Sequence, residues 1–376
     1  DEETSEEEDN NESWSNESRN LSNRILWPMK TLARRSRVVE QLVAELLQVC
    51  QKRLSKSFFP ELQPAIGVGS AFEGWSPDEE ADYYMLVPLK PPRGHSFHLE
   101  LGHMGAMLAQ DSRIRVETQC TCTEKDILCF VHTNEEELWK NQDPSLLHTM
   151  CTNSYLDAWR TVSWFQELVK SVWAAVPQSH HYSLQVLPSC WFCRMLLTSV
   201  SGRTLSVVIM FGVQQDNSDI YLSTMPVNPR DPRTTWPQTC AVAEAKFFRF
   251  VAQNTQPGSV HLKCLYLCTS ILEGTTISAT TMKRVVMHYL HQSWQLQDLE
   301  VWRTRDFVKL LEGILSFLLC CLEDKRMDHF FIGNDSLPEE IILPPDFRTG
   351  EKVNVLQCLQ EHLPNHIAAM RAIHEL

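Results

Sequence analysis

Residues 67–89 read GVGSAFEGWSPDEEADYYMLVPL, a glycine-rich turn followed by a cluster of acids and an apolar strand. Gly69-Ser70 follows a strand-like segment and opens a short helix, where backbone N–H groups and the serine hydroxyl can hold a phosphate. Glu80 and Asp82 stand two residues apart at the start of the next strand. Because a strand alternates its faces residue by residue, both carboxylates project from the same face. The stretch therefore predicts a site for a phosphate and a cation.

Paired carboxylates on one strand face are typical ligands of Mg²⁺, which takes oxygen ligands and commonly keeps substrate phosphates as well. Phosphoryl transfer with two metal ions requires a third carboxylate nearby, because both ions have to be held at once. Without a third acid, the same residues fit a loop that carries solvated acids. The spacing of Glu80 and Asp82 leaves both interpretations open.

Length and composition allow two compact lobes with a core in each, because the chain has 376 residues and 43% of them are hydrophobic. The formal net charge is −13, so the overall field repels polyanions and makes double-stranded DNA an unfavourable partner. Residues 1–9 (DEETSEEED) carry much of the acid excess and have no apolar surface to bury. We predict that residues 1–30 form an acidic, disordered segment.

The cysteines indicate a reduced protein without a disulfide framework. There are 13 of them, an odd number, scattered along the chain, whereas disulfide scaffolds are small and evenly paired. The longest apolar run, residues 314–322, is interrupted by Ser316 and is too short to span a bilayer. We therefore expect the folded domain itself to be soluble.

The chain changes character near residue 225. Strand and helix patterns alternate before this point, and helical patterns dominate after it. Four prolines between Pro226 and Pro237 mark the boundary. We expect an α+β fold with a mixed-sheet lobe at residues 31–225, which begins with a long helix, and an all-helical lobe at residues 226–376.

The expected elements of the first lobe are two amphipathic helices, a hairpin and two strands joined by a glycine turn. They fall at residues 34–57 and 155–176 (helices), 113–119 with 127–131 (hairpin), and 190–199 with 205–213 (strands). In the second lobe, helices are expected at residues 241–251, 260–272, 280–294 and 306–322.

Several separated motifs in order make the chain resemble the male abnormal 21 (Mab-21) family, and within it the inositol trisphosphate receptor-interacting branch. They are Gly67 to Trp75, Tyr84 to Leu89, Leu156 to Phe165, His261 to Leu265 and His329 to Asn334. The resemblance runs from about residue 34 to the C-terminus. It implies a nucleotidyltransferase-like lobe followed by a helical Mab-21 lobe, the architecture shared with cyclic GMP–AMP synthase.

The resemblance also assigns roles to single residues. Ser70 matches the serine that holds the nucleotide phosphate, and Glu80 and Asp82 match the first two metal ligands. The strand that supplies the third ligand reads Leu205-Ser-Val-Val-Ile here, so that Val208 replaces the acid. Asp216 is the nearest downstream acid and lies roughly 26 Å further along an extended strand, too far to bind the same ion.

The resemblance then implies a catalytically inactive Mab-21 domain protein that binds or regulates a partner. The partner it implies is the inositol trisphosphate receptor, with an effect on calcium release. It also implies a single-pass, membrane-associated full-length protein whose N-terminal anchor precedes Asp1.

Two alternatives remain. One is a Mg²⁺-dependent nucleotidyltransferase that makes a cyclic or linear dinucleotide with Glu80, Asp82 and an unidentified third acid. The other is a nucleotide sensor without turnover. In active relatives, lysines of the helical lobe contact the nucleotide, and here Lys263 and Lys283 are the candidates to join Gly69 and Ser70.

Cys120, Cys122, Cys129 and His132 form a C-x-C-x6-C-x2-H pattern. Three thiols and an imidazole can bind Zn²⁺ tetrahedrally. Cys-x-Cys is not the common zinc knuckle, however, and Cys129 of a hairpin can face the core, so structural thiols are the favoured interpretation. Residues 257–268 do not reproduce the paired cysteines of the zinc thumb in cyclic GMP–AMP synthase.

The densest basic run contains Lys30, Arg34, Arg35 and Arg37. Such a stripe can attract phosphates or anionic lipid, and it would suit a segment next to a membrane. A solvated helix face is the simpler interpretation.

Overall fold

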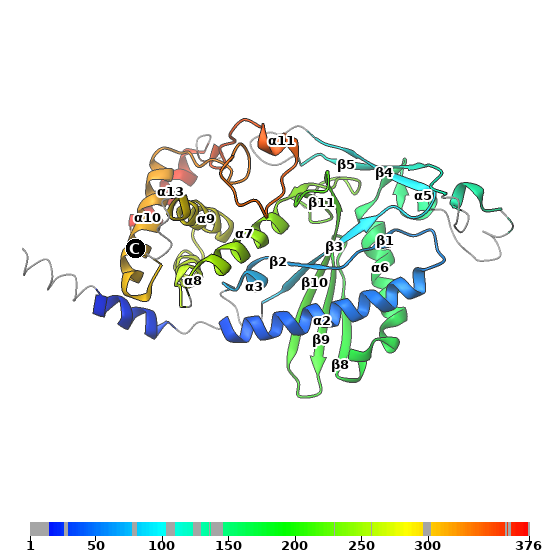
Figure 1. The fold of residues 1–376 in the computed structure, drawn as a ribbon, viewed down its shortest axis with the longest axis horizontal. Coiled ribbons are helices and arrows are strands. Elements are labelled where there is room, and N and C mark those ends of the chain that lie inside the picture. The colour runs from blue at the N-terminus through cyan, green and yellow to red at the C-terminus, as the bar shows by residue number, and fades with distance from the viewer. Residues whose placement is uncertain are drawn as a thin grey trace, which may run out of the picture.

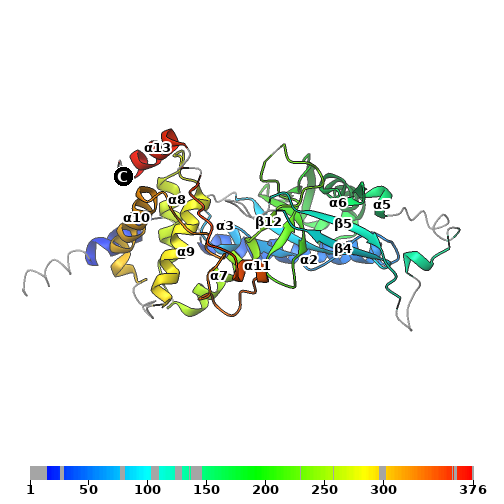
Figure 2. The same ribbon diagram turned by 90° about the horizontal axis from the view of Figure 1, so that it is seen from above.

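In the computed structural model (Figure 1), helices gather at one end and two sheets at the other, as the view from above also shows (Figure 2). The structure describes residues 15–374 except 26–28, 77–80, 103–109, 123–128, 135, 137–145, 229, 257, 296–301, 358 and 360–361. The α+β fold class that the sequence predicted is confirmed.

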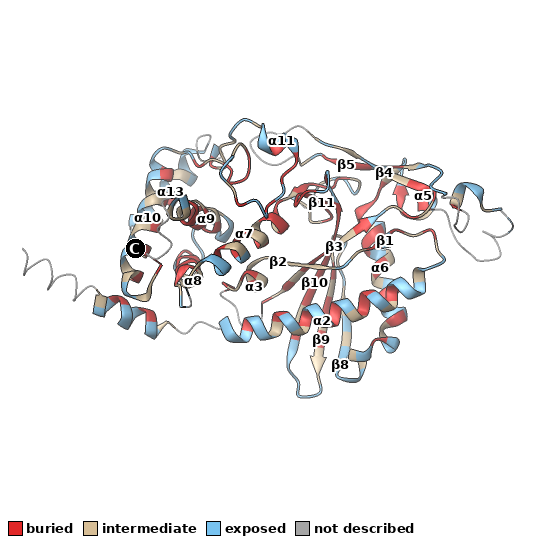
Figure 3. Cartoon of the chain, viewed as in Figure 1, coloured by how far each residue is buried: buried red, intermediate tan, exposed pale blue. Residues whose placement is uncertain are grey.

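The long helix α2 (Met29–Leu54) runs along one side of the sheet end. Its apolar residues recur at helical spacing and face the core, among them Val39, Val43 and Leu46, each 0% exposed, while its other face is exposed (Figure 3). The helix starts five residues before the predicted start at Arg34. Leu32, which is 1% exposed, is the one buried residue of this first turn, and a single apolar residue shows no helical period.

The larger sheet is mixed. Its central strands β3 (Tyr83–Lys90) and β10 (Thr204–Gln214) are parallel, and the remaining pairs are antiparallel. Helix α6 (Ala158–Val172) packs on it through Phe165, whose ring centroid lies 5.0 Å from that of Phe211. The other strands are β1 (Glu61–Leu62), β2 (Ile66–Val68), β8 (Tyr182–Leu187), β9 (Cys193–Ser199), β11 (Tyr221–Ser223) and β12 (Gln238–Thr239).

The smaller sheet corrects two predictions. Its order is β4 (His95–Glu100), β5 (Arg113–Thr118), β7 (Tyr155–Leu156) and β6 (Cys151–Thr152). The predicted hairpin is wrong, because both edges of β5 are taken by β4 and β7, and Phe130–His132 form a 3₁₀ turn. Helix α6 starts three residues later than predicted, because Asp157 caps it by accepting the Arg160 N–H.

The helical end has a core of its own. It is built from α7 (Ala241–Asn254), α8 (His261–Ile271), α9 (Ala279–Gln295), α10 (Phe307–Glu323) and α13 (Leu363–His374). The structure also contains three short helices, α3 (Ser70–Glu73), α5 (Leu146–Thr149) and α11 (Pro345–Arg348).

The sheet continues past the predicted boundary at residues 225 and 226. Trp236 is 0% exposed in the core of the sheet end, and its Nε1–H donates to the Leu156 carbonyl at 2.8 Å. Strand β12 then pairs with β11 up to Thr239. The change from sheet to helices therefore lies at Cys240, since the proline-rich loop folds back onto the sheet.

Residues 15–24 form a helix, so the prediction of disorder for residues 1–30 is wrong for this part. Ser18 and Ser22 are buried against the helical end, and the Val308 N–H donates to Ser18 Oγ at 3.4 Å. Small hydroxyl side chains allow this close approach without an apolar stripe, which is why composition gave no sign of it. Residues 1–14 lie outside the described residues.

Within the described ranges, no helix has both the length and the apolar character needed to cross a membrane.

Replacing Leu46 by alanine should lower the free energy of unfolding by about 2–5 kcal/mol, because it opens a cavity where α2 meets the sheet. Gln48 is exposed on the same helix, and Gln48→Ala should change stability by less than about 0.5 kcal/mol. Urea unfolding followed by tryptophan fluorescence measures both. Equal effects of the two changes would contradict the placement of α2.

Candidate functional site

The two glycines of the turn are required for different structural reasons. Gly69 caps α3 with φ 80° and ψ −179°, a backbone conformation that residues other than glycine rarely adopt. At Gly67, a Cβ atom would lie 2.4 Å from Cδ1 of the Phe72 ring, so the ring needs the glycine. Ser70 then begins α3, and the predicted order of strand, turn and short helix is present.

Asp82, the predicted metal ligand at the start of β3, is held by protein groups. Arg194 Nη2 of β9 lies 2.9 Å from Asp82 Oδ2, and the Ser206 hydroxyl of β10 donates to Oδ1 at 2.5 Å. Its side chain is 26% exposed and that of Arg194 is 34% exposed. A guanidinium therefore occupies a side of the carboxylate where a cation was expected.

The register across the sheet places Val208 on the same face. Val208 pairs with Tyr84 of β3 on one side and with Arg194 of β9 on the other. Directly paired residues share a face, so Val208 lies between Tyr84 and the arginine that binds Asp82. It is 0% exposed. Burial raises the pKa of Tyr84, and the charge of Asp82 raises it further.

Glu80, the second predicted metal ligand, lies outside the described residues. Asp216 sits with φ 48° in the turn after β10, at the opposite end of that strand from Ser206. Asp216 therefore lies too far along the strand to act as a third ligand together with Asp82, as its sequence spacing predicted.

Lys283 of α9, predicted to face the nucleotide, lies in the interior. Its Nζ atom is 2.6 Å from Glu73 Oε1 of α3 and 2.6 Å from Glu244 Oε2 of α7. The Trp75 indole N–H donates to the other oxygen of Glu73 at 2.6 Å. The cluster joins the end of the glycine-rich turn to two helices of the helical end.

Burial and charge act in opposite directions in this cluster. Burial lowers the pKa of Lys283, but the two carboxylates outweigh it and raise the pKa above its ordinary value. Burial raises the pKa of Glu244, but Lys283 outweighs it and lowers the pKa. For Glu73 burial dominates and raises the pKa. A lysine engaged in this way is not available to a phosphate.

Lys263 of α8, the other predicted nucleotide contact, binds the N-terminal helix. Its Nζ donates to the carbonyl of Ser22 and lies 3.1 Å from Ser22 Oγ. Burial lowers the pKa of Lys263. The two candidate lysines thus have protein partners on different elements.

Two curated proteins are similar to most of this chain. The chain is 30% identical over 351 residues to inositol 1,4,5-trisphosphate receptor-interacting protein-like 1 of Rattus norvegicus, covering 90% of this chain and 64% of the relative. The Homo sapiens inositol 1,4,5-trisphosphate receptor-interacting protein is 25% identical over 351 residues, covering 86% and 63%. The chain is a homologue of these receptor-interacting proteins. No protein-family model matches it.

This relationship confirms the resemblance predicted from the separated motifs. The chain spans a little under two thirds of the length of the relatives above.

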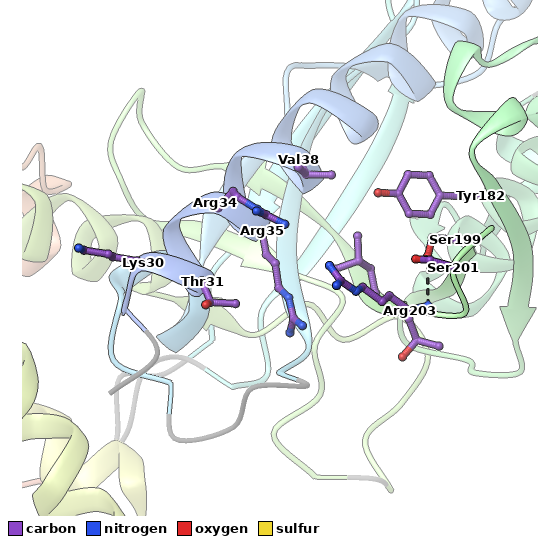
Figure 4. Close-up of a pocket in the computed structure, with 11 residues that line it drawn as sticks. Lys30, Thr31, Arg34, Arg35, Val38, Tyr182, Ser199, Ser201 and Arg203 are labelled. Carbon is purple, nitrogen blue, oxygen red and sulfur yellow. Dashed lines mark hydrogen bonds between the residues drawn. The ribbon is translucent and has the colours of Figure 1, made fainter. Parts of the chain in front are cut away.

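A second candidate site is a basic pocket of about 520 Å³ between the start of α2 and the β9–β10 hairpin (Figure 4). Lys30, Arg34 and Arg35 line it from α2, and Arg203 from the hairpin. The Arg203 backbone N–H donates to Ser199 Oγ at 3.1 Å, which fixes the hairpin tip. The eleven described lining residues include no acid, in a chain of net charge −13. The pocket suits an anion.

Cys120, Cys122, Cys129 and His132 also come together. Their ligand atoms lie within 4.8 Å of one another, and Cys129 is buried whereas the other three residues are exposed. Of these four residues, only Cys129 therefore fits the interpretation of a buried structural thiol.

The sequence analysis missed Arg194, Ser206 and Glu244. Arg194 lies 112 residues from Asp82, and Ser206 lies 124 residues from it, so no local spacing shows these contacts. One signal was present: Arg194 is a charged residue in the apolar run Cys193–Ser199, and a charge in such a strand needs a partner.

Replacing Lys283 by methionine should destabilise the protein by about 3–5 kcal/mol, because two buried carboxylates lose their cation. Without Lys283 their pKa values rise above those of the unfolded chain, so the folded variant gains stability as the pH falls. The difference in free energy of unfolding between Lys283→Met and the wild type, measured by urea unfolding, should decrease as the pH falls from about 8 to about 5.

Lys170→Met provides the matched control, because Lys170 pairs with Glu167 at the surface, where the two side chains are 52% and 74% exposed. It should cost less than about 1 kcal/mol. A Lys283→Met variant as stable as this control would contradict the buried cluster.

Proposed function

We propose that this chain is a catalytically silent, nucleotidyltransferase-like domain that acts as a binding module. The observation that carries the proposal is the Arg194–Asp82 ion pair beside Val208. In an active site of this type, Asp82 and an acid at position 208 would hold a cation between them. Here position 208 carries a buried valine in place of the acid, and Asp82 is paired with the guanidinium of Arg194.

Electrostatics supports this interpretation. A doubly charged ion at about 4 Å from a guanidinium is repelled by at most roughly 8 kcal/mol at an effective dielectric constant of about 20, and solvent at this partly exposed pair reduces that figure. The ion would also have to displace the Ser206 hydroxyl from Oδ1 or share that oxygen. Both effects weaken Mg²⁺ binding at Asp82.

The relatives supply the partner for the proposal. Their names state that they interact with the inositol 1,4,5-trisphosphate receptor. We infer that this chain binds the same receptor and influences calcium release, with the Mab-21 architecture as its scaffold. Because the chain spans only part of the relatives, membrane anchoring of the full-length protein belongs to the proposal as well.

Purified chain incubated with ATP, GTP and Mg²⁺ or Mn²⁺ should give no cyclic or linear dinucleotide above background, because the cation has no complete carboxylate set. Chromatography with mass detection measures this. Product that disappears in an Asp82→Asn variant would overturn the silent proposal and favour the nucleotidyltransferase.

Association with the receptor should not depend on the ion pair. In co-purification from membranes at matched expression, wild type and the neutral double variant Asp82→Asn with Arg194→Gln should retain receptor equally. Loss of binding in the variant alone would mean that this face takes part in recognition. Absence of receptor from both would refute the partnership.

The basic pocket favours a second function, contact with an anionic lipid surface. Lys30 and Arg34 are exposed at the first turns of α2, and Arg203 lies across the pocket from Arg34 (Figure 4). Phosphate-bearing headgroups are attracted by such clusters by about 1 kcal/mol per basic residue. This contact would place the N-terminal end of α2 at the membrane.

Lys30→Glu with Arg34→Glu should reduce sedimentation with phosphatidylserine vesicles, because it reverses two charges at the pocket. Lys52→Glu with Arg53→Glu makes the same charge change in the last turn of α2 and should leave binding close to the wild type. Equal losses in both double variants would show a response to net charge and would remove the pocket from the proposal.

A further inference from the structure

Three thiols converge on one imidazole nitrogen beside the smaller sheet. Cys120, Cys122 and Cys129 place their Sγ atoms 3.7, 3.4 and 3.5 Å from His132 Nδ1. A ring nitrogen has either one hydrogen to donate or one lone pair to accept with. Hydrogen bonding therefore accounts for one of these contacts and leaves two unexplained.

A tetrahedral ion accounts for all of them. Zn–S bonds of about 2.3 Å and Zn–N bonds of about 2.0–2.1 Å place sulfur and nitrogen about 3.6 Å apart and two sulfurs about 3.8 Å apart. The three sulfur–nitrogen distances lie within about 0.2 Å of that value, and all four ligand atoms lie within 4.8 Å of one another. Three sulfurs and one nitrogen are a donor set that selects zinc among common cellular metals.

The backbone holds the four residues in place. Cys120 and Cys122 follow the end of β5, where the Gln119 N–H donates to the Gly94 carbonyl at 2.9 Å. The Gly94 N–H in turn donates to Thr121 Oγ1 at 2.8 Å, between the two cysteines.

The other two ligands flank the 3₁₀ turn Phe130–His132. The His132 N–H donates to the Cys129 carbonyl at 3.0 Å, which sets their side chains on one side of the turn. This turn packs tightly on the strand end, because a Cβ atom at Gly94 would lie 2.6 Å from the Phe130 nitrogen. The ligands thus come from two segments in close contact.

A backbone donor also points at one of the sulfurs. The Cys129 backbone N–H lies 3.4 Å from Cys122 Sγ and points a positive dipole at it. Thiolates are the ligands of zinc, and the ion compensates most of their charge when it binds.

We propose that Cys120, Cys122, Cys129 and His132 form a closed, structural zinc site that joins the end of β5 to the turn Phe130–His132. Protein side chains would fill all four coordination positions of the ion, which leaves no open position for a substrate. The site lies on the smaller sheet, away from the helical end (Figure 1). It is independent of the proposed binding function.

Chain purified under reducing conditions without added metal should contain about one zinc ion per molecule by mass spectrometry of the elements. Cys120→Ser and His132→Ala should each reduce the zinc content several-fold. Cys190→Ser and Cys320→Ser also alter exposed cysteines, but outside the cluster, and should keep it. Circular dichroism confirms that each variant is folded.

Cobalt substitution tests the geometry without a variant. Wild-type chain in which Co²⁺ replaces zinc should show the intense visible bands of tetrahedral cobalt with thiolate ligands. Removing the metal with a chelator should lower the unfolding temperature of the wild type but not of Cys120→Ser. Purified protein without metal and without cobalt bands, or with a Cys120–Cys122 disulfide in its place, would overturn the site.

Discussion

The buried ammonium of Lys283, held between Glu73 and Glu244, is the interaction on which the two ends of the molecule depend. Removing three charged groups from water is unfavourable unless they pair closely, and here both contacts are 2.6 Å. Glu73 closes the helix that the glycine-rich turn starts, while the other two residues come from α7 and α9. The turn is therefore fixed to the helical end by this cluster, and removing any one of its three charged groups should strongly destabilise the fold.

This attachment bears on the function of the turn. A phosphate site needs donors that are open to a ligand, but Lys283, to which the sequence analysis gave this role, is 7% exposed and pairs with two carboxylates. In the sheet, the carboxylate of Asp82 in turn contacts Arg194 and Ser206. Lys283 and Asp82, which the sequence assigned to nucleotide and metal binding, thus each have partners within the protein.

Much of this fold was readable from the sequence because it rests on periodic burial. The apolar stripe of α2 and the strand Tyr83–Lys90 follow from spacing alone. Pairing partners did not follow, because alternation in Arg113–Thr118 predicts a strand but does not say which strands flank it. The N-terminal helix escaped notice because the residues buried within it are Ser18 and Ser22, which show no apolar period.

The sites were predictable only in part, for a related reason. The sequence singled out Asp82, which the structure places in an ion pair, and it named all four members of the cysteine–histidine cluster. It could not supply Arg194, which comes from a strand 112 residues away. It also could not show that three thiols share one nitrogen, since that depends on the contact between the end of β5 and the turn Phe130–His132.

We propose that Arg194 occupies the place of a cation at Asp82, and Mn²⁺ binding followed by electron paramagnetic resonance can test this. Wild type should show no Asp82-dependent Mn²⁺ site tighter than about 1 mM, and Arg194→Ala should bind Mn²⁺ more tightly than wild type does. A Mn²⁺ site in the wild type that Asp82→Asn abolishes and Arg194→Ala leaves unchanged would contradict it.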